Sequence, residues 1–250
     1  MPMGVFITGG AGGLGNALAE SFGSRGIAVA VADLDLDAAE TTARELRKKY
    51  PALAATGVEC DVTDPASVDE AWVRAVADLG PLETLVNNAG VFRPMPFLKM
   101  SPQAWDRTMQ VNLYGAFHTC QRAVRDWVQE GRPGSIVNIA SIAALNAGYG
   151  GTADYGASKA GLVGLTIHLA VDLGPHGIRT NAVAPGSFYS PMNAERFAAP
   201  GQEESSAALT PLRRIATPEE VAAAAVFLAL DATYVNGVVI PVDGGTAVRM

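Results

Sequence analysis

The sequence has few cysteines, no excess of positive charge and no long apolar run. Its 250 residues include only two cysteines, Cys60 and Cys120, which lie in no paired-ligand spacing and are predicted to be buried free thiols. The 18 basic side chains are outnumbered by 25 acidic ones, and the net charge of −7 disfavours nucleic acid and anionic membranes as partners. The longest strongly apolar run, Val221–Leu230, is about half as long as a membrane span.

Two further signals are missing. The amino terminus has no basic segment followed by an apolar one, so it does not look like a secretion signal, and we expect a cytoplasmic protein. The three histidines, His118, His168 and His176, have no carboxylate or thiol at a ligand spacing. We therefore expect structural roles for them and predict no metal site.

The sequence does contain a regular alternation of short β-rich segments with longer helical ones. This alternation predicts parallel strands joined by right-handed helical crossovers. Because most strand segments are apolar throughout, helices are expected on both faces of the sheet. The predicted fold class is α/β, a Rossmann-like, doubly wound, seven-stranded parallel sheet in a single domain spanning residues 1–250. The predicted strands are Val5–Thr8, Ala28–Asp33, Ala55–Asp61, Thr84–Asn87, Ser135–Ser141, Arg179–Ala184 and Val238–Val242.

Capping residues and prolines mark several boundaries. Asp64-Pro65, Ser101-Pro102 and Thr217-Pro218 each predict a helix that begins at the proline. Asp37 is the preferred cap of the helix that follows the second strand. Pro241 cannot donate a hydrogen bond to a ladder, so the last strand is placed at an edge of the sheet. Residues 185–211 are rich in Gly, Ser, Ala and Pro, and we interpret them as a substrate-binding loop or lid.

A glycine-rich turn, Thr8–Gly15, follows the first strand and leads into a helical segment. Glycines allow a tight turn and close approach of a pyrophosphate, whose charge the amides and dipole of the helix N-terminus favour. Such a motif also occurs in flexible loops, so it is a hypothesis rather than proof.

The second strand ends in Asp33, whose side chain can accept hydrogen bonds from the adenosine ribose hydroxyls. A 2′-phosphate within about 4 Å of this carboxylate would be opposed by about 4 kcal/mol per unit charge, so NAD is predicted in preference to NADP. The alternative is that Asp33 is a solvated turn residue or a helix cap.

A second group of polar residues lies in the middle of the chain. Ser141 ends a predicted strand, and Tyr155 and Lys159 lie four residues apart in a helical segment that runs to Leu173. This spacing places both side chains on one face of a helix. A phenol is a poor base at neutral pH unless its pKa falls by about 3 units, and Lys159 together with an oxidised nicotinamide could supply the required stabilisation. The same spacing is also common on exposed helix faces.

Taken together, the ordered motifs resemble the classical short-chain dehydrogenase/reductase family over essentially the whole chain. The matching elements are Thr8–Gly15, Asp61-Val62, Asn87–Gly90, Asn112, Ser141, Tyr155 with Lys159, Pro185-Gly186 and Val242–Gly245.

The resemblance implies a role for each matched position. The implied catalytic residues are Ser141, which would bind the substrate oxygen, Tyr155, which would move the proton, Lys159, which would bind the nicotinamide ribose, and Asn112, which would hold a water that links Lys159 to solvent. The implied cofactor-binding residues are Gly9, Gly12, Gly13, Leu14, Gly15, Asp33, Leu34, Asp61, Val62, Asn88, Ala89, Gly90, Tyr155, Lys159, Pro185, Gly186, Phe188 and Ser190. The hydroxyl of Ser190 stands where the family usually has Thr.

The favoured function is that of an NAD-dependent oxidoreductase, EC 1.1.1.-, which interconverts a secondary alcohol and a ketone. Family likeness also implies a homotetramer. An apolar substrate is expected, because the segments that would surround it contain Phe92, Met95, Phe97, Phe188, Tyr189, Met192 and Phe197. Arg93 or Arg196 could instead anchor an anionic group, although a solvated loop position is the simpler interpretation. The alternatives are a catalytically silent dinucleotide sensor, an NADPH-dependent 3-ketoacyl reductase and a methyltransferase.

Overall fold

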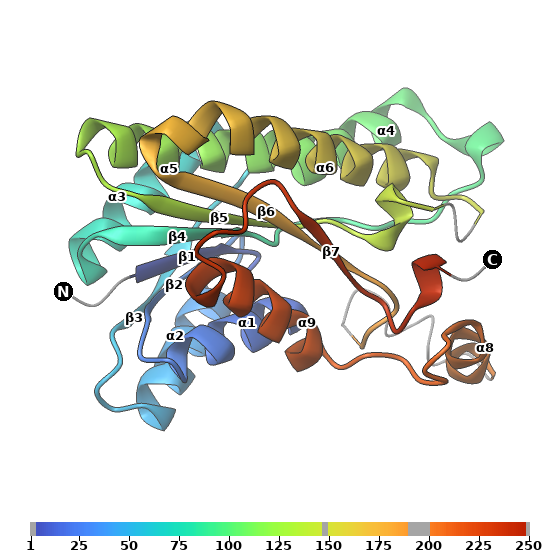
Figure 1. Ribbon diagram of the computed structural model, residues 1–250, viewed down its shortest axis with the longest axis horizontal. Coiled ribbons are helices and arrows are strands. Elements are labelled where there is room, and N and C mark those ends of the chain that lie inside the picture. The colour runs from blue at the N-terminus through green and yellow to red at the C-terminus, as the bar shows by residue number, and fades with distance from the viewer. Residues whose placement is uncertain (1–3, 147–149, 190–200, 249–250) are drawn as a thin grey trace.

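One seven-stranded parallel sheet organises the chain (Figure 1). The computed structural model describes residues 4–146, 150–189 and 201–248. The strands follow the order β3-β2-β1-β4-β5-β6-β7. Their bounds are β1 Gly4–Thr8, β2 Ala28–Asp33, β3 Ala55–Glu59, β4 Leu82–Asn87, β5 Gly134–Ile139, β6 Ile178–Pro185 and β7 Val239–Val242. The predicted Rossmann-like doubly wound sheet is confirmed, and β7, which contains Pro241, is an edge strand as expected.

Helices cover both faces of this sheet. The α-helices of the described residues are α1 Gly13–Gly23, α2 Leu36–Lys49, α3 Pro65–Leu79, α4 Pro102–Met109, α5 Gly115–Gln129, α6 Ala153–Leu173, α8 Gln202–Leu209 and α9 Pro218–Val226, and of these α4 and α8 lie away from the sheet. A π-helical turn, η2 Gln110–Tyr114, joins α4 to α5, and a 3-10 turn, η3 Ile142–Ala144, follows β5.

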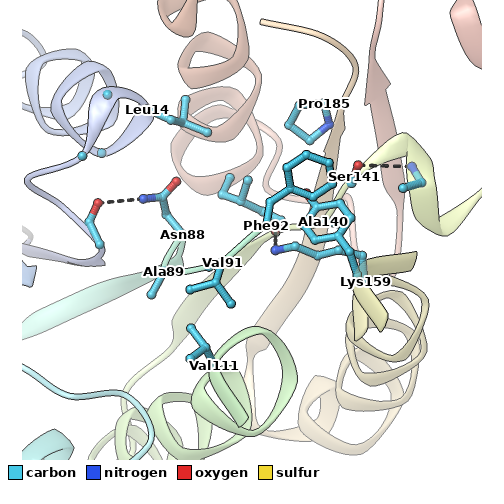
Figure 2. A pocket seen from close by; sticks show the side chains of 18 of the residues that line it. Leu14, Asn88, Ala89, Val91, Phe92, Val111, Ala140, Ser141, Lys159 and Pro185 are labelled. Carbon is cyan, nitrogen blue, oxygen red and sulfur yellow. Dashed lines mark hydrogen bonds between the residues drawn. The ribbon is translucent and has the colours of Figure 1, made fainter. Parts of the chain in front are cut away.

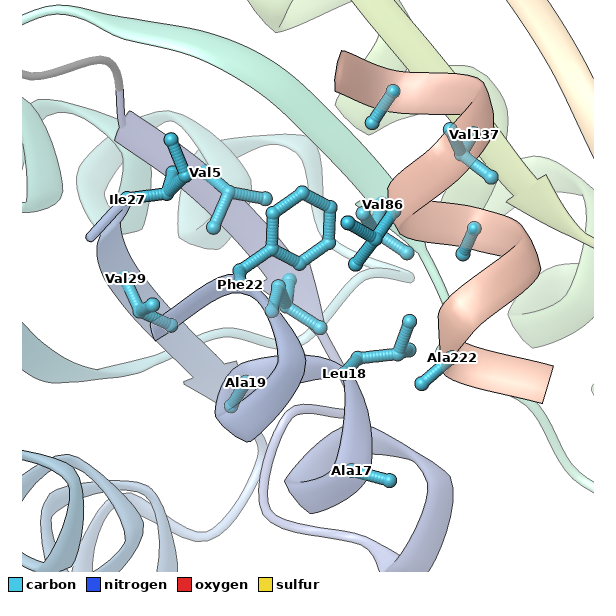
Figure 3. Close-up of a cluster of buried hydrophobic side chains, with 14 of the residues drawn as sticks. Val5, Ala17, Leu18, Ala19, Phe22, Ile27, Val29, Val86, Val137 and Ala222 are labelled. Carbon is cyan, nitrogen blue, oxygen red and sulfur yellow. The ribbon is translucent and has the colours of Figure 1, made fainter. Parts of the chain in front are cut away.

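The core is divided by the sheet into two apolar clusters. On one face, α1, α2 and α9 pack against alternate strand residues, with Leu18 and Phe22 fully buried beside Val5 (Figure 3). On the other face, α3 and α5 bury Trp72 and Trp127 against the remaining strand residues. Apolar burial on both sides explains why the strands have no polar alternation.

The predicted helix starts at Asp64-Pro65, Ser101-Pro102 and Thr217-Pro218 are confirmed, the last with a capping box closed by Glu220. The prediction of Asp37 as a cap is wrong. Asp35 caps α2 instead, because its carboxylate accepts a hydrogen bond from the Ala38 amide at 3.0 Å, while Asp37 lies in the first turn.

Two strands end earlier than predicted. β3 ends at Glu59 rather than Asp61, because the Asp61 carboxylate accepts hydrogen bonds from Thr63 and closes a turn. β5 ends at Ile139 rather than Ser141, because the Ser141 hydroxyl oxygen accepts the Ala143 amide and caps η3. In both cases a short-range polar side chain competes with the ladder.

The strands β2 and β3 lie on one side of β1, whereas β4 and all later strands lie on its other side, so the strand order reverses between β1 and β4. In open α/β sheets, ligands bind at the carboxyl ends of the strands at such a point. The glycine turn after β1 and Asn88–Gly90 after β4 both lie there. In the part of the chain that the structure describes, no helix is both long and apolar enough to span a bilayer.

Candidate active site

The N-terminus of α1 is open, unlike those of most other helices. Its N-cap, Gly12, makes no side-chain hydrogen bond, and the first turn contains no acidic residue. By contrast, capping side chains begin α2, α3, α4 and α9. The amides of the first turn of α1 are therefore available to an anionic ligand.

The glycines of this turn fall into two kinds. A Cβ on Gly15 would lie 2.1 Å from the Gly9 carbonyl oxygen, and Gly9 itself has a φ of +59°, so both positions need glycine for the turn to form. A Cβ on Gly12 would meet only the Gly9 oxygen, at 3.5 Å. Because Gly12 lines the cavity, a side chain there would fill space that a bound pyrophosphate could use.

Asn88 connects the ends of β1 and β4. Its side-chain amide donates to the carbonyl oxygens of Thr8 and Gly9, at 3.1 and 2.9 Å (Figure 2). The Thr8 hydroxyl oxygen accepts hydrogen bonds from the amides of Asn88 and Ala89, each at 3.1 Å. These bonds hold the glycine turn against the strand end that forms the floor of the cavity.

Asp33 is fixed beside the glycine turn. One carboxylate oxygen accepts the Ala11 amide at 3.0 Å and the other accepts the Asp35 amide at 3.3 Å. Asp33 and the neighbouring Leu34 both line the cavity. The carboxylate thus presents a negative charge to this end of the cavity while it retains accepting positions for hydroxyl groups.

The loop after β3 forms the adjoining wall, where Asp61 and Val62 line the cavity. The Val62 carbonyl lies 3.0 Å from Nδ1 of His118 in α5, and since a carbonyl oxygen only accepts, Nδ1 must carry the proton. Nothing in the spacing of the sequence indicated this contact, because the two residues are far apart along the chain.

Three of the four predicted catalytic side chains, Ser141, Tyr155 and Lys159, line the cavity together at its other end, where Figure 2 labels Ser141 and Lys159. The Tyr155 phenol is hydrogen-bonded to the Ser141 side chain. Lys159 is 4% exposed, donates to the Ile139 carbonyl oxygen at 2.7 Å, and has its Nζ 5.9 Å from the centre of the Tyr155 ring.

Burial changes the proton affinities of this pair. Removal from water raises the pKa of Tyr155, and the hydrogen bond from Ser141 opposes this rise. Burial also lowers the pKa of Lys159 to about 8. The sequence predicts that Lys159 and an oxidised nicotinamide together lower the pKa of Tyr155. In the protein without the cofactor, the pKa of Tyr155 is raised instead.

Asn112 lies behind the cavity wall rather than on it, in the π-helical turn η2. Its side-chain amide donates to the Val91 carbonyl and to the Ser158 hydroxyl, at 3.0 and 3.1 Å, and its oxygen accepts the Val91 amide at 2.8 Å. Both donors are therefore occupied by the protein. A Cβ on Gly90 would lie 3.3 Å from the Asn112 side-chain oxygen and 3.6 Å from Lys159 Nζ. The position that a Gly90 side chain would take is therefore bordered by both of these polar atoms.

One cavity of about 460 Å³ unites nearly all the predicted residues. Those that line it are Gly9, Gly12, Gly13, Leu14, Gly15, Asp33, Leu34, Asp61, Val62, Asn88, Ala89, Gly90, Ser141, Tyr155, Lys159, Pro185, Gly186 and Phe188. Ser190 lies outside the described residues. Val91, Ala143 and Asn146, from segments expected to surround the substrate, and Ser187, from the predicted loop, line it as well, and the lining residues without a predicted role include Cys60, Arg107, Val111, Ile139, Ala140, Ile142 and Thr152.

The expected apolar lining near Tyr155 is present in part. The Phe92 ring meets the Tyr155 ring edge-on with centroids 4.8 Å apart, and Phe188 also lines the cavity. The inclusion of Phe97 is wrong, because the 3-10 turn Phe97–Lys99 leaves its side chain 69% exposed. Met95 and Tyr189 do not line the cavity, and Met192, Arg196 and Phe197 lie outside the described residues.

Both cysteines are buried and free, and burial raises the pKa of each thiol to about 12. Within residues 4–146, 150–189 and 201–248, no three His, Cys, Asp or Glu side chains gather so that they could hold a metal ion.

Comparison with known sequences gives matches over almost the entire chain. The family described as Enoyl-(Acyl carrier protein) reductase matches residues 9–247. A 3beta-hydroxysteroid dehydrogenase of Eggerthella lenta is 40% identical over 96% of this chain and 92% of its own. A D-threitol dehydrogenase of Mycolicibacterium smegmatis is 39% identical over 97% of this chain and 92% of its own.

Solved structures agree with these sequence matches. A gluconate 5-dehydrogenase of Burkholderia cenocepacia, in complex with NADP and tartrate, superposes with a TM-score of 0.93 at 32% identity and covers 99% of this chain and 96% of that one. Levodione reductase superposes with a TM-score of 0.93 at 30% identity, covering 99% and 98%.

Proposed function

Because this chain belongs to the short-chain dehydrogenase/reductase family, we propose that it is an NAD(H)-dependent oxidoreductase that interconverts a secondary alcohol and a ketone. One observation carries the proposal. A single cavity joins the open N-terminus of α1 and Asp33 at one end to Ser141, Tyr155 and Lys159 at the other. This arrangement suits a dinucleotide whose reactive ring lies beside an acid/base group.

The preference for NAD rests on Asp33. Its carboxylate would accept hydrogen bonds from the adenosine ribose hydroxyls and repel a 2′-phosphate by about 4 kcal/mol per unit charge at 4 Å. The family alone does not decide the cofactor, since relatives include an L-rhamnose 1-dehydrogenase (NAD(P)(+)) and the gluconate 5-dehydrogenase in complex with NADP.

The remaining cofactor contacts follow from the cavity wall. The α1 turn from Gly12 to Gly15 would hold the pyrophosphate, and Leu34, Asp61 and Val62 would enclose the adenine. Asn88–Gly90, together with Pro185, Gly186 and Phe188, would enclose the nicotinamide half. Ser190 is proposed for the same group on family likeness.

Bound NAD supplies a ring carbon that accepts or returns a hydride. The protein supplies the proton transfer. Ser141, whose oxygen already accepts the Ala143 amide, has one hydroxyl proton, which it would turn from Tyr155 toward the substrate oxygen. Tyr155 takes the alcohol proton during oxidation and returns it during reduction. Lys159 stabilises the phenolate of Tyr155. Asn112 holds the backbone of Val91 in place through two hydrogen bonds. On family likeness, Asn112 would also bind the water through which Lys159 exchanges protons.

The substrate class is proposed to be apolar. Phe92 and Phe188 place aromatic surface at the reaction end, with Ile142 and Ala143 beside them. Such a lining favours a carbonyl compound or secondary alcohol with a largely hydrocarbon body. We also propose that residues 185–211 act as the substrate loop.

A cytoplasmic homotetramer is the proposed form of the enzyme. Large apolar side chains remain exposed on the neighbouring helices α5 and α6, namely Tyr114 at the turn before α5, Phe117 and Val128 on α5, and Ile167 and Val171 on α6. Contact between copies would bury them.

The test is an activity panel of matched primary, secondary and tertiary alcohols with NAD or NADP. We expect reduction of NAD by secondary alcohols and none by tertiary ones, which have no hydrogen on the carbinol carbon. Tyr155→Phe should retain NAD binding and lose about 10²- to 10⁴-fold in turnover. Full turnover by this variant, or NAD binding without any turnover in the wild type, would contradict the proposal.

A further inference from the structure

Two side-chain hydrogen bonds join α6 to the helix that contains α4 and η2. In the first, the Thr108 hydroxyl donates to the Asp154 carboxylate at 2.6 Å. In the second, the Asn112 amide donates to the Ser158 hydroxyl at 3.1 Å. On each helix the two partners are four residues apart, so the bonds form successive rungs separated by one helical turn. We call this pair of bonds the α4–α6 ladder.

Both rungs lie directly beside the proposed reaction chemistry. Asp154 precedes Tyr155, and Ser158 precedes Lys159. The second rung reaches Tyr155 through the backbone as well, because the Ser158 hydroxyl donates to the Tyr155 carbonyl oxygen at 2.8 Å. A rotation of α6 about its axis would therefore break the rungs and swing both functional side chains together.

The first rung contains a buried carboxylate that the proposed mechanism does not use. Asp154 is 4% exposed and Thr108 is 5% exposed. The Thr108 hydroxyl has one proton and lies 3.2 Å from the Ala104 carbonyl but 2.6 Å from the carboxylate, so donation to Asp154 is the stronger bond. Burial of a carboxylate is unfavourable unless hydrogen bonds compensate it, so this position needs its partner.

The surrounding surface of α6 explains why polar rungs are needed. Beside the second rung this helix carries Gly161, three residues after Ser158. A Cβ on Gly161 would lie 2.8 Å from the Leu113 side chain, which shows how closely the helices approach. A glycine permits this approach but has no side chain to interdigitate there, so the polar rungs help to define the rotation of α6.

We propose that Thr108 and Asp154 are positioning residues that set the rotation of α6 and thereby aim Tyr155 at the substrate oxygen. The inference rests on the proposed function, since it assigns the effect to proton transfer at Tyr155. The two residues act through the helix and do not themselves react.

The experiment compares three single variants. Thr108→Val removes the hydroxyl while keeping the shape, and Thr108→Ser keeps the hydroxyl. Thr166→Val is the matched control. Like Thr108, Thr166 is a buried threonine, and its hydroxyl is hydrogen-bonded to Asn138 and Leu162. Thr166 lies on α6 itself, but about three helical turns away from Tyr155. For each variant, kcat, the KM for NAD and the melting temperature are measured.

Thr108→Val should lower kcat about ten-fold or more, since misplacement of a reacting group by about 1 Å has large effects on rate, and should change the KM for NAD much less than kcat. Thr108→Ser should restore kcat. Thr166→Val should lower the melting temperature but keep kcat near the wild-type value. If Thr108→Val is insoluble, Thr108→Val/Asp154→Asn removes the hydroxyl without leaving a buried charge unpaired, and the same loss of kcat is expected.

The inference is overturned if Thr108→Val keeps full kcat, or if Thr166→Val loses as much kcat as Thr108→Val. Tyr155→Phe in the same series separates this failure from that of the proposed function. An inactive Tyr155→Phe beside a fully active Thr108→Val refutes the ladder alone, whereas an active Tyr155→Phe refutes the function.

Discussion

The two ends of the cavity are built in different ways. The end beside Asp33 consists of turns that follow strands, closed in part by local bonds such as Asp33 to Asp35 and Asp61 to Thr63 and joined to one another by the bonds of Asn88 to Thr8 and Gly9. The end beside Tyr155 depends on side chains of helices, with the rung from Thr108 to Asp154 spanning 46 residues. The first end is thus built mainly from turns at strand ends, and the second depends on how whole helices pack.

This difference suggests a division of labour. We infer that the turn-built end determines which dinucleotide binds and how tightly, and that the helix-built end determines the rate of proton and hydride transfer. Variants at one end should therefore change affinity or cofactor preference, and variants at the other should change turnover.

The largest effect is expected for Lys159→Met, at the helix-built end. Turnover should fall by about 10²-fold or more, because the phenolate loses its neighbouring cation. Stability should move in the opposite direction. Burial lowers the pKa of Lys159 to about 8, so below pH 8 the folded protein bears the full cost of the buried charge, roughly 3 kcal/mol.

Removal of that charge should leave the variant about 1 to 2 kcal/mol more stable at pH 7, after the loss of the bond to Ile139. Between pH 8 and the ordinary pKa of lysine, only the unfolded wild type keeps the proton, so wild-type stability should rise with pH, and the difference should pass through zero and then favour the wild type, which keeps the bond to Ile139. Denaturant unfolding at several pH values measures this. A variant that is less stable than the wild type at pH 7 would refute the assigned burial.

The next effect is expected for Gly12→Ala, at the turn-built end. Its methyl group would occupy the space assigned to the pyrophosphate, so NAD affinity should fall about ten-fold or more, while the melting temperature changes little. Calorimetric titration with NAD measures the affinity. Gly15→Ala is the contrasting variant, because its methyl would collide with the Gly9 carbonyl and lower stability as well. Undiminished NAD affinity in folded Gly12→Ala would remove the pyrophosphate from this turn.

The smallest effect is expected for Asp33→Asn, which should shift the ratio of kcat/KM values for NAD and NADP toward NADP by about ten-fold, because Asp33 is only partly buried and screening by water and salt leaves part of the roughly 4 kcal/mol repulsion that applies at about 4 Å. The amide oxygen can still accept the Ala11 amide, so the turn should persist. Asp35→Asn is the matched control, since it removes an equal charge two residues away, at a position that does not line the cavity. Equal shifts in both variants would mean that general charge, rather than contact at Asp33, sets the preference.

The same contrast explains what could be predicted from the sequence. The glycine turn, Asp33 and the seven parallel strands follow from local signals, namely glycine spacing, strand ends and alternating elements. The residues placed on the cavity wall by family likeness also gather there, apart from Asn112 behind the wall and Ser190, which lies outside the described residues.

Contacts between distant segments could not be predicted. The bond from His118 to the Val62 carbonyl, the packing of Phe92 on Tyr155 and the α4–α6 ladder depend on helix rotation and close packing, which leave no periodic signal in the sequence. The errors at Phe97 and Asp37 are local instead. At Asp37 the helix begins two residues earlier than expected, and at Phe97 a 3-10 turn that no sequence signal indicated leaves the residue exposed.

Direct transfer of a hydride within this cavity is most sharply tested with a secondary alcohol that carries deuterium on its carbinol carbon, by measuring the mass of the cofactor after reaction. The account predicts one deuterium in each reduced cofactor formed by the wild type, and essentially no reduced cofactor from Tyr155→Phe. Unlabelled reduced cofactor from the wild type, or undiminished labelling by Tyr155→Phe, would contradict it.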